Sequence, residues 1–156
     1  MRLSTYRWTQ AVGVAGVVFA VSAAAAVTAR AQAPAGAGSS VGSGVYSDDQ
    51  AKRGEAAATK LCTSCHGPEL SGGEAGPALV GLEFLGNWNN LTAGDLYDRV
   101  QSTMPADAPG TLTPQQVSDV MSYIFKLNKF PAGTTELPTD LAALKGIKIE
   151  GAQPAK

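Results

Sequence analysis

The chain has 156 residues, of which 44% are hydrophobic and 16% are charged, and its formal net charge is −1. This length predicts one domain with its own core, and the absence of a basic excess argues against a nucleic-acid-binding protein. The 18 Gly and 9 Pro predict long loops, and the scarcity of alternating β-branched runs argues against a sheet.

The first 31 residues have the pattern of a secretory signal peptide. Arg2 and Arg7 form a positive n-region, and an apolar stretch rich in Ala and Val follows over residues 11–29. Ala29-Arg30-Ala31 is an Ala-x-Ala-like cleavage site, so we expect cleavage after it and export to the periplasm. The alternative is an uncleaved membrane anchor, because the apolar stretch is close to the lower limit of about 17–25 residues for a spanning helix.

The mature chain is expected to have three parts. Cleavage removes three arginines and leaves a mildly acidic protein. Residues 32–45 are rich in Gly, Ala, Ser and Pro, and we expect a flexible linker with nothing to bury. The folded domain is expected over residues 46–133, and residues 134–156 are expected to form an extended C-terminal tail.

The first helix is expected to begin after Ser47, which has acidic residues in the following turn and a Gln at the capping-box position. It is expected to end at about Leu61. Small and apolar residues at helical spacing predict its packing face: Ala51, Gly54, Ala58 and Leu61. The lack of a side chain at Gly54 would let another helix approach closely.

The helix leads into Cys62-Thr63-Ser64-Cys65-His66, the Cys-x-x-Cys-His pattern of covalent c-type haem attachment. Two thiols at this spacing can add to the two vinyl groups of one haem, and the residue after the second Cys then lies under the iron. We therefore expect one haem c, bound through Cys62 and Cys65, with His66 as an axial ligand of the iron.

Other chemistries also use a Cys-x-x-Cys pair. A structural zinc site needs four protein ligands, and the chain has only two Cys and one His, so a carboxylate would have to complete the site. A thioredoxin-like pair would need a surrounding βαβ pattern, and none is visible. A disulfide within the motif would close a small ring that adds little stability. The His that follows the second Cys favours haem attachment.

A Gly-rich segment over residues 69–86 is expected to be a loop. It is apolar for a loop, which suits a segment that lies on a large apolar ligand. A backbone carbonyl of residues 76–78, around Pro77, is expected to accept a hydrogen bond from the second ring nitrogen of His66. Trp88 follows, and its indole N–H is expected to bind a haem propionate, with a core-filling role as the alternative.

A second long helix is expected from the capping box of Thr92 and Asp95 to about Gln101. Met104 follows directly before Pro105, and a residue before proline is disfavoured in the helical region. We expect Met104 in an extended strap that crosses the other face of the haem and supplies the sixth iron ligand. Met is the usual partner of His, and the chain has no second His. The alternative is an open or water-ligated iron.

The last long helix has the clearest start in the chain, with Thr113 as cap and Pro114 at the first position. Apolar residues then recur at helical spacing: Val117, Val120, Met121, Ile124 and Phe125. Met121 is therefore expected to fill the core. Asn128 is expected to end this helix, and one further helical turn is expected near residues 139–144.

Taken together, these residues resemble the class I mono-haem cytochromes c over about residues 46–133. The resemblance rests on Cys62-Thr63-Ser64-Cys65-His66-Gly67, Gly76-Pro77-Ala78-Leu79, Phe84, Trp88, Met104-Pro105 and Tyr123-Ile124-Phe125-Lys126-Leu127. It implies an all-α cytochrome c fold, with three to four helices wrapped around one covalently bound haem and with crossing N- and C-terminal helices. It also implies that Gly54 lies at the crossing near Tyr123 and Ile124, and it supports Pro77 and Met104 in their roles.

The segment Asn128-Lys129-Phe130-Pro131-Ala132-Gly133, followed by Leu137-Pro138, is similar to cytochromes c associated with quinoprotein dehydrogenases. This looser resemblance implies a periplasmic dehydrogenase as electron donor, with an oxidase or another cytochrome as acceptor.

The expected function is that of an electron carrier and not of an enzyme, because the sequence contains no substrate machinery. One alternative is a cytochrome subunit docked permanently to a dehydrogenase through residues 130–156. Another is an open-iron haem enzyme or sensor, which would need a second His for acid–base chemistry near the iron. Contact with a membrane is expected only if the N-terminal segment is retained.

Overall fold

The structure is a computed structural model that describes residues 39–151. The predicted signal peptide and the first part of the predicted linker lie outside the described residues. The elements in chain order are β1 (Ser39–Ser40), the 3-10 helix η1 (Val41–Ser43), α1 (Asp48–Leu61), α2 (Thr63–His66), the 3-10 turn η2 (Pro68–Leu70), α3 (Gly81–Trp88), α4 (Ala93–Thr103), α5 (Pro114–Leu127), α6 (Leu141–Lys145) and β2 (Ile147–Lys148). The predicted all-α class is confirmed, apart from one two-stranded pair. The described residues form six α-helices, where three to four were expected.

The long helices begin where the capping residues predicted. The Ser47 hydroxyl accepts the N–H of Gln50 at the start of α1, and Thr92 and Thr113 form capping boxes at the starts of α4 and α5. Each cap satisfies N–H groups that a helix start leaves without partners. Asn128 is the C-cap of α5, as expected. Leu61 differs from the prediction, because its side chain is 37% exposed and does not join the packing face of α1.

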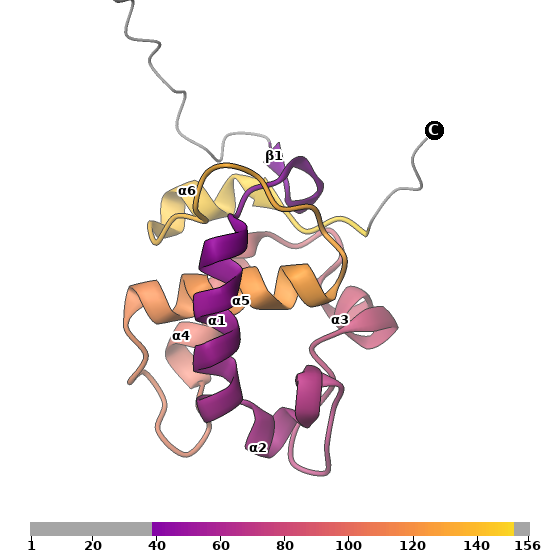
Figure 1. Cartoon of the computed structure of the whole chain (residues 1–156), viewed down its shortest axis with the longest axis vertical. Coiled ribbons are helices and arrows are strands. Elements are labelled where there is room, and N and C mark those ends of the chain that lie inside the picture. The colour runs from indigo at the N-terminus through magenta and orange to yellow at the C-terminus, as the bar shows by residue number, and fades with distance from the viewer. Residues whose placement is uncertain (1–38, 152–156) are drawn as a thin grey trace, which may run out of the picture. The chain divides into compact units, whose positions relative to one another are not determined.

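Helices α1 and α5 cross (Figure 1), and Gly54 lies at the crossing. A Cβ atom at Gly54 would overlap the carbonyl oxygen of Asp119 and would lie 3.0 Å from the Cβ of Tyr123. Beside this contact, the Arg53 guanidinium donates to both carboxylate oxygens of Asp119, from Nε at 3.1 Å and from Nη2 at 3.0 Å. The predicted crossing at Gly54 is confirmed, and a bidentate ion pair holds it.

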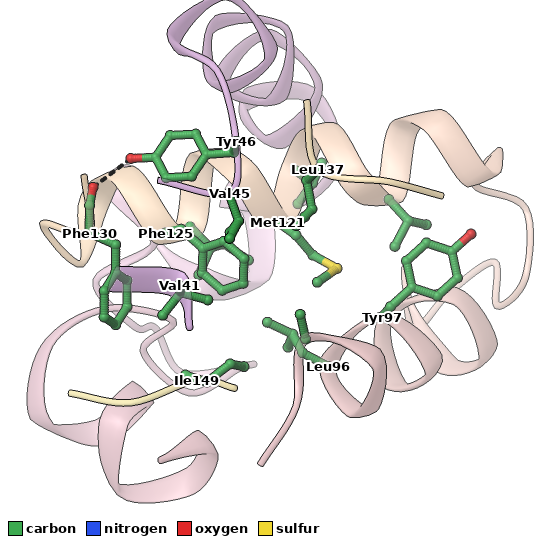
Figure 2. Packing of buried hydrophobic residues seen from close by; sticks show 14 of the residues in the cluster. Val41, Val45, Tyr46, Leu96, Tyr97, Met121, Phe125, Phe130, Leu137 and Ile149 are labelled. Atoms are coloured by element: carbon green, nitrogen blue, oxygen red, sulfur yellow. Dashed lines mark hydrogen bonds between the residues drawn. The ribbon is translucent and has the colours of Figure 1, made fainter. Parts of the chain in front are cut away.

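The core gathers large side chains from α4, α5, the segment before α1 and the segment after α5 (Figure 2), whereas α1 contributes small ones. Met121 is fully buried there, which confirms its predicted packing role. The Tyr46 hydroxyl donates to the backbone carbonyl of Phe130 at 2.6 Å. Burial, with a smaller contribution from nearby Asp48, raises the pKa of Tyr46 to about 12. The hydroxyl therefore stays a protonated donor at any ordinary pH.

The segment before Tyr46 is a correction to the predicted linker. Val41 is fully buried and Val45 is 6% exposed, so part of the expected linker contributes to the core. Ser39 and Ser40 also pair in parallel with Ile147 and Lys148 to form the small sheet, which the sequence analysis did not expect. The sequence analysis missed this packing because glycine and serine dominate the composition of the linker, and two valines alone give no periodic pattern.

The predicted extended tail is also a correction, because it packs onto the domain that precedes it. The buried Gln50 side chain donates to the carbonyl of Leu137 at 3.0 Å and accepts its N–H at 2.7 Å. Further along, four apolar side chains are 0–2% exposed: Leu137, Leu144, Ile147 and Ile149. The helical turn expected near residues 139–144 is present as α6, and Gly146 ends it.

Helix α3 is a third correction, because its residues fall largely in the predicted loop over residues 69–86. Phe84 is buried and Leu85 and Trp88 pack against the core, so the helix has an apolar face at helical spacing. Its start lacks a capping side chain from its own sequence, and Gly81 has a positive φ of 69°. The usual sequence signals of a helix start are therefore missing.

Within residues 39–151, no helix is long and apolar enough to cross a membrane.

The close approach at Gly54 predicts a large effect of one methyl group. We expect Gly54→Ala to lower the free energy of unfolding by about 3 kcal/mol, because inserting carbon into a packed core costs about 1–3 kcal/mol or more. Denaturant unfolding of the purified protein measures this change.

Gly86→Ala is the matched control, since Gly86 lies in α3 and an added Cβ would have no atom within 4 Å. It should raise the stability by up to about 1 kcal/mol through helix propensity. Equal stabilities of the two variants would contradict the close approach of α5 to Gly54.

Candidate functional site

A cavity of about 320 Å³ opens beside the Cys-x-x-Cys-His motif. Its walls come from the end of α1 and from α2, from the loop before α3, from α4 and the strap that follows it, and from one face of α5. Apolar side chains dominate this lining: Leu61, Leu79, Val100, Leu112, Val120 and Ile124. Its volume and lining are typical of a small-molecule or cofactor site, for which volumes of about 300–1,000 Å³ are usual.

Five of the six predicted site residues line this one cavity: Cys62, Cys65, His66, Pro77 and Met104. Met104 is about forty positions further along the chain than His66, and the crossing of α1 and α5 brings their segments together. Trp88 does not line the cavity. It lies half-buried at the end of α3 and packs against the core, so its predicted contact with a propionate stays a prediction.

The two cysteines sit on one tight turn. The N–H groups of Cys65 and His66 both donate to the carbonyl of Cys62, at 3.2 Å and 2.9 Å. Both thiols are free and half-buried. Burial, with a smaller contribution from Cys65, raises the pKa of the Cys62 thiol. A redox-active dithiol has a lowered thiol pKa, so this environment does not support the thioredoxin-like alternative.

His66 is held in one orientation by the loop that follows it. Its side chain is 8% exposed, and its Nδ1 lies 2.7 Å from the carbonyl oxygen of Pro77. Because a carbonyl only accepts hydrogen bonds, Nδ1 must carry the ring proton. In the neutral imidazole with this tautomer, Nε2 has the lone pair with which the ring can bind a metal.

Gly76 permits the close approach of this loop to the imidazole. A Cβ atom at Gly76 would lie 3.0 Å from both Cε1 and Nδ1 of His66, which is tighter than ordinary carbon contacts. The carbonyl of Gly76 accepts the N–H of Gly73 at 3.0 Å, so the turn before Pro77 is also fixed. The Gly-Pro pair therefore provides both the space and the acceptor.

Met104 lies in the strap between α4 and α5. Its backbone is extended (φ −120°, ψ 150°), as the following proline predicts. The Gln101 amide donates to the carbonyl of Leu112 at 2.9 Å and so ties the two ends of the strap together. Met104 lines the cavity and Met121 does not, so Met104 is the thioether available to a group bound there.

The donors around the cavity fit haem c better than a lone metal ion. Within the described part of the chain, no group of three or more His, Cys, Asp or Glu side chains is placed to hold a metal ion. The zinc alternative therefore lacks its ligand set there. Two thiols on one turn, an imidazole with a free Nε2, a thioether and an apolar cavity are instead the groups that attach, ligate and enclose a haem.

Residues 49–124 match the family model described as cytochrome c oxidase, cbb3-type, subunit III. The domain has the cytochrome c fold. The match supports a class I c-type cytochrome, and a cytochrome c domain binds haem and uses it for electron transfer. No curated protein and no solved structure matches the chain. The matched residues begin in α1 and end in α5, so they span the cavity and all five site residues that line it.

The sequence analysis missed one residue of this site. Asn128 was expected only to end α5, yet its side chain also bonds the loop that carries Pro77. A lone Asn at a helix end gives no sequence signal for such a role, because its partners are distant backbone groups.

Proposed function

We propose that the protein is a one-electron carrier with a single haem c. Cys62 and Cys65 would hold the haem covalently, and His66 and Met104 would be its axial ligands. When bound, the haem supplies an iron that changes between the ferric and ferrous states, and Met/His ligation raises its reduction potential. The observation that carries this proposal is that both thiols, the imidazole and one thioether line the same apolar cavity.

Each residue has a distinct task in this proposal. The carbonyl of Pro77 accepts a hydrogen bond from Nδ1 of His66 and so fixes the tautomer of the ring, which leaves Nε2 as the nitrogen that would bind the iron. Leu112, Val120 and Ile124 are buried in the cavity wall and exclude water. A dry wall stabilises the less charged ferrous state and limits the access of other ligands.

The surface around the cavity mouth supports brief contacts with redox partners. The exposed residues that line the cavity define this cavity rim: Lys60, Leu61, Ser64, Ala75, Pro77, Ala106, Asp107 and Thr111. Its two charges are of opposite sign and the rest of the rim is neutral. Redox partners form small interfaces, with less than about 1,200 Å² of buried surface, and a neutral rim of this kind fits a partner with a neutral face.

We propose a periplasmic dehydrogenase of the quinoprotein type as donor, on the likeness of residues 128–138 to cytochromes that serve such enzymes. An oxidase or another cytochrome would be the acceptor. Export to the periplasm rests on the signal-peptide pattern of residues 1–31.

A permanently docked subunit is less well supported. The segment over residues 130–156 was the expected docking strap, but its apolar side chains Leu137, Leu144, Ile147 and Ile149 are buried within the domain itself. Among the described residues, the exposed large hydrophobics are only Leu61, Leu82 and Leu91. A permanent interface would need a larger apolar surface.

An open-iron enzyme or sensor is also less well supported. The chain has one His, and it is the proposed proximal ligand. No second imidazole is therefore available for acid–base chemistry on a bound substrate.

The axial pair predicts a specific spectral change. The ferric protein, matured with haem, should show the weak far-red absorption band of Met-ligated haem. Met104→Ala should abolish this band, because the thioether would be lost and water or another ligand would take its place.

Met121→Leu is the matched control. It removes the other thioether of the described residues and nearly keeps the core volume, at a cost below about 1.5 kcal/mol of stability. The band should survive in this variant. A band that survives Met104→Ala would contradict the proposed ligand.

The neutral cavity rim predicts weak salt dependence. We expect the rate constant for electron self-exchange between ferric and ferrous copies to change less than about threefold as salt rises from about 0.01 to 0.15 M. Charge steering would instead contribute a factor of about 10 to 1,000. Nuclear magnetic resonance line broadening measures this rate.

Lys60→Glu supplies the control, because the rim of this variant carries two negative charges, at position 60 and at Asp107. Self-exchange of this variant should be slower at low salt and should recover as salt rises. A tenfold salt effect in the unmodified protein would contradict the neutral docking face.

A further inference from the structure

Asn128 joins three backbone groups from two parts of the fold. Its Oδ1 accepts the N–H of Gly81 at 2.9 Å, and its Nδ2 donates to the carbonyls of Leu79 at 3.0 Å and Ile124 at 2.9 Å. Both amide protons and the amide oxygen are used, so only a carboxamide provides this full set. The side chain therefore fastens the loop before α3 to the C-terminal end of α5.

The fastened loop is the one that orients His66. Leu79 lies two residues after Pro77, and its N–H also donates to the carbonyl of Leu70 at 2.9 Å. On the other side of Pro77, the bond from Gly73 to Gly76 fixes the chain. Pro77 therefore sits in a short span held at both ends. Two side chains hold the end that follows it: Asn128 donates to the carbonyl of Leu79, and the Glu83 carboxylate accepts the N–H of Ala78 at 3.3 Å.

The position of the Pro77 carbonyl has a chemical consequence for His66. A hydrogen bond from Nδ1–H to a good acceptor gives the imidazole more electron density and makes it a stronger iron ligand. A stronger ligand stabilises the ferric state relative to the ferrous state and so lowers the reduction potential. A displaced carbonyl would weaken this bond and raise the potential.

We propose that Asn128 is a positioning residue for His66. It acts through Leu79 and Pro77, and it sets the strength of the Nδ1 hydrogen bond and thereby the reduction potential. This inference rests on the proposed ligation of the iron by His66. Asn128 does not itself line the cavity, and its hydrogen bonds go to backbone groups and not to the imidazole, so its influence on His66 is indirect.

The test compares reduction potentials of haem-loaded protein in three forms: unmodified, Asn128→Leu and Asn128→Asp. Leu removes all three hydrogen bonds, whereas Asp keeps the size and the acceptor for Gly81 but loses both donors. We expect Asn128→Leu to shift the ferric–ferrous equilibrium about threefold toward the ferrous state. For one electron this is a rise of about 28 mV, at 59 mV per tenfold change. The negative charge of the carboxylate in Asn128→Asp favours the ferric state, so this variant should show a smaller shift than Asn128→Leu.

One further readout and one control variant separate positioning from general loosening. The Nδ1 proton of His66 in the ferrous protein should exchange with solvent faster in both variants than in the unmodified protein. Ser118→Ala is the matched control, because it removes one hydrogen bond from the same helix, to the carbonyl of Pro138, outside the cavity. It should leave both the potential and this exchange rate unchanged.

The outcomes separate this inference from the proposed function. If the unmodified protein lacks the far-red band of Met ligation, the proposed axial pair fails. If that band is present and both Asn128 variants keep the unmodified potential and proton exchange rate, the positioning role is overturned and the carrier assignment stands. Should Asn128→Leu fail to fold, the proton exchange rate of Asn128→Asp decides alone, because this variant preserves the packing volume.

Discussion

The close crossing of α1 and α5 is the constraint on which the site depends. Because Gly54 has no side chain, the backbone of α1 can lie against the carbonyl of Asp119 on α5. The end of α1 leads directly into the Cys-x-x-Cys-His motif, and α5 supplies Val120 and Ile124 to the cavity wall. The absence of a Cβ atom at Gly54 thus sets how closely the Cys-x-x-Cys-His motif lies to the cavity wall on α5.

The ends of the described chain reinforce this arrangement. The β1–β2 pair joins residues near position 40 to residues near position 148, and Gln50 and Ser118 hold the intervening tail over α1 and α5. Burial of apolar side chains from both ends adds to the core. The tail therefore completes the fold that presents the site, and its apolar side chains are not available as a docking strap.

Much of this fold could be predicted from the sequence, because its signals are local. The caps at Ser47, Thr92 and Thr113 depend on residues within one turn. The extended backbone at Met104 follows from the proline after it. Such signals act over short distances and need no knowledge of the fold.

The parts that could not be predicted depend on partners far along the chain. Helix α3 starts without a cap of its own, and the N–H of Gly81 is instead accepted by Asn128, 47 positions away. Val41 and Val45 become core residues only because other segments cover them. The exposure of Leu61 was missed for the same reason, because helical spacing predicts which residues share a face of α1 but not which distant segments cover that face.

As sixth ligand, Met104 would close the iron to other ligands, and the binding of carbon monoxide tests whether it does. The absorption spectrum of the reduced, haem-loaded protein should be the same before and after the addition of carbon monoxide, because a six-coordinate His/Met iron has no free position. A rapid change to the spectrum of a carbon monoxide adduct would show an open iron. The electron-carrier account would then be contradicted in favour of a haem enzyme or sensor.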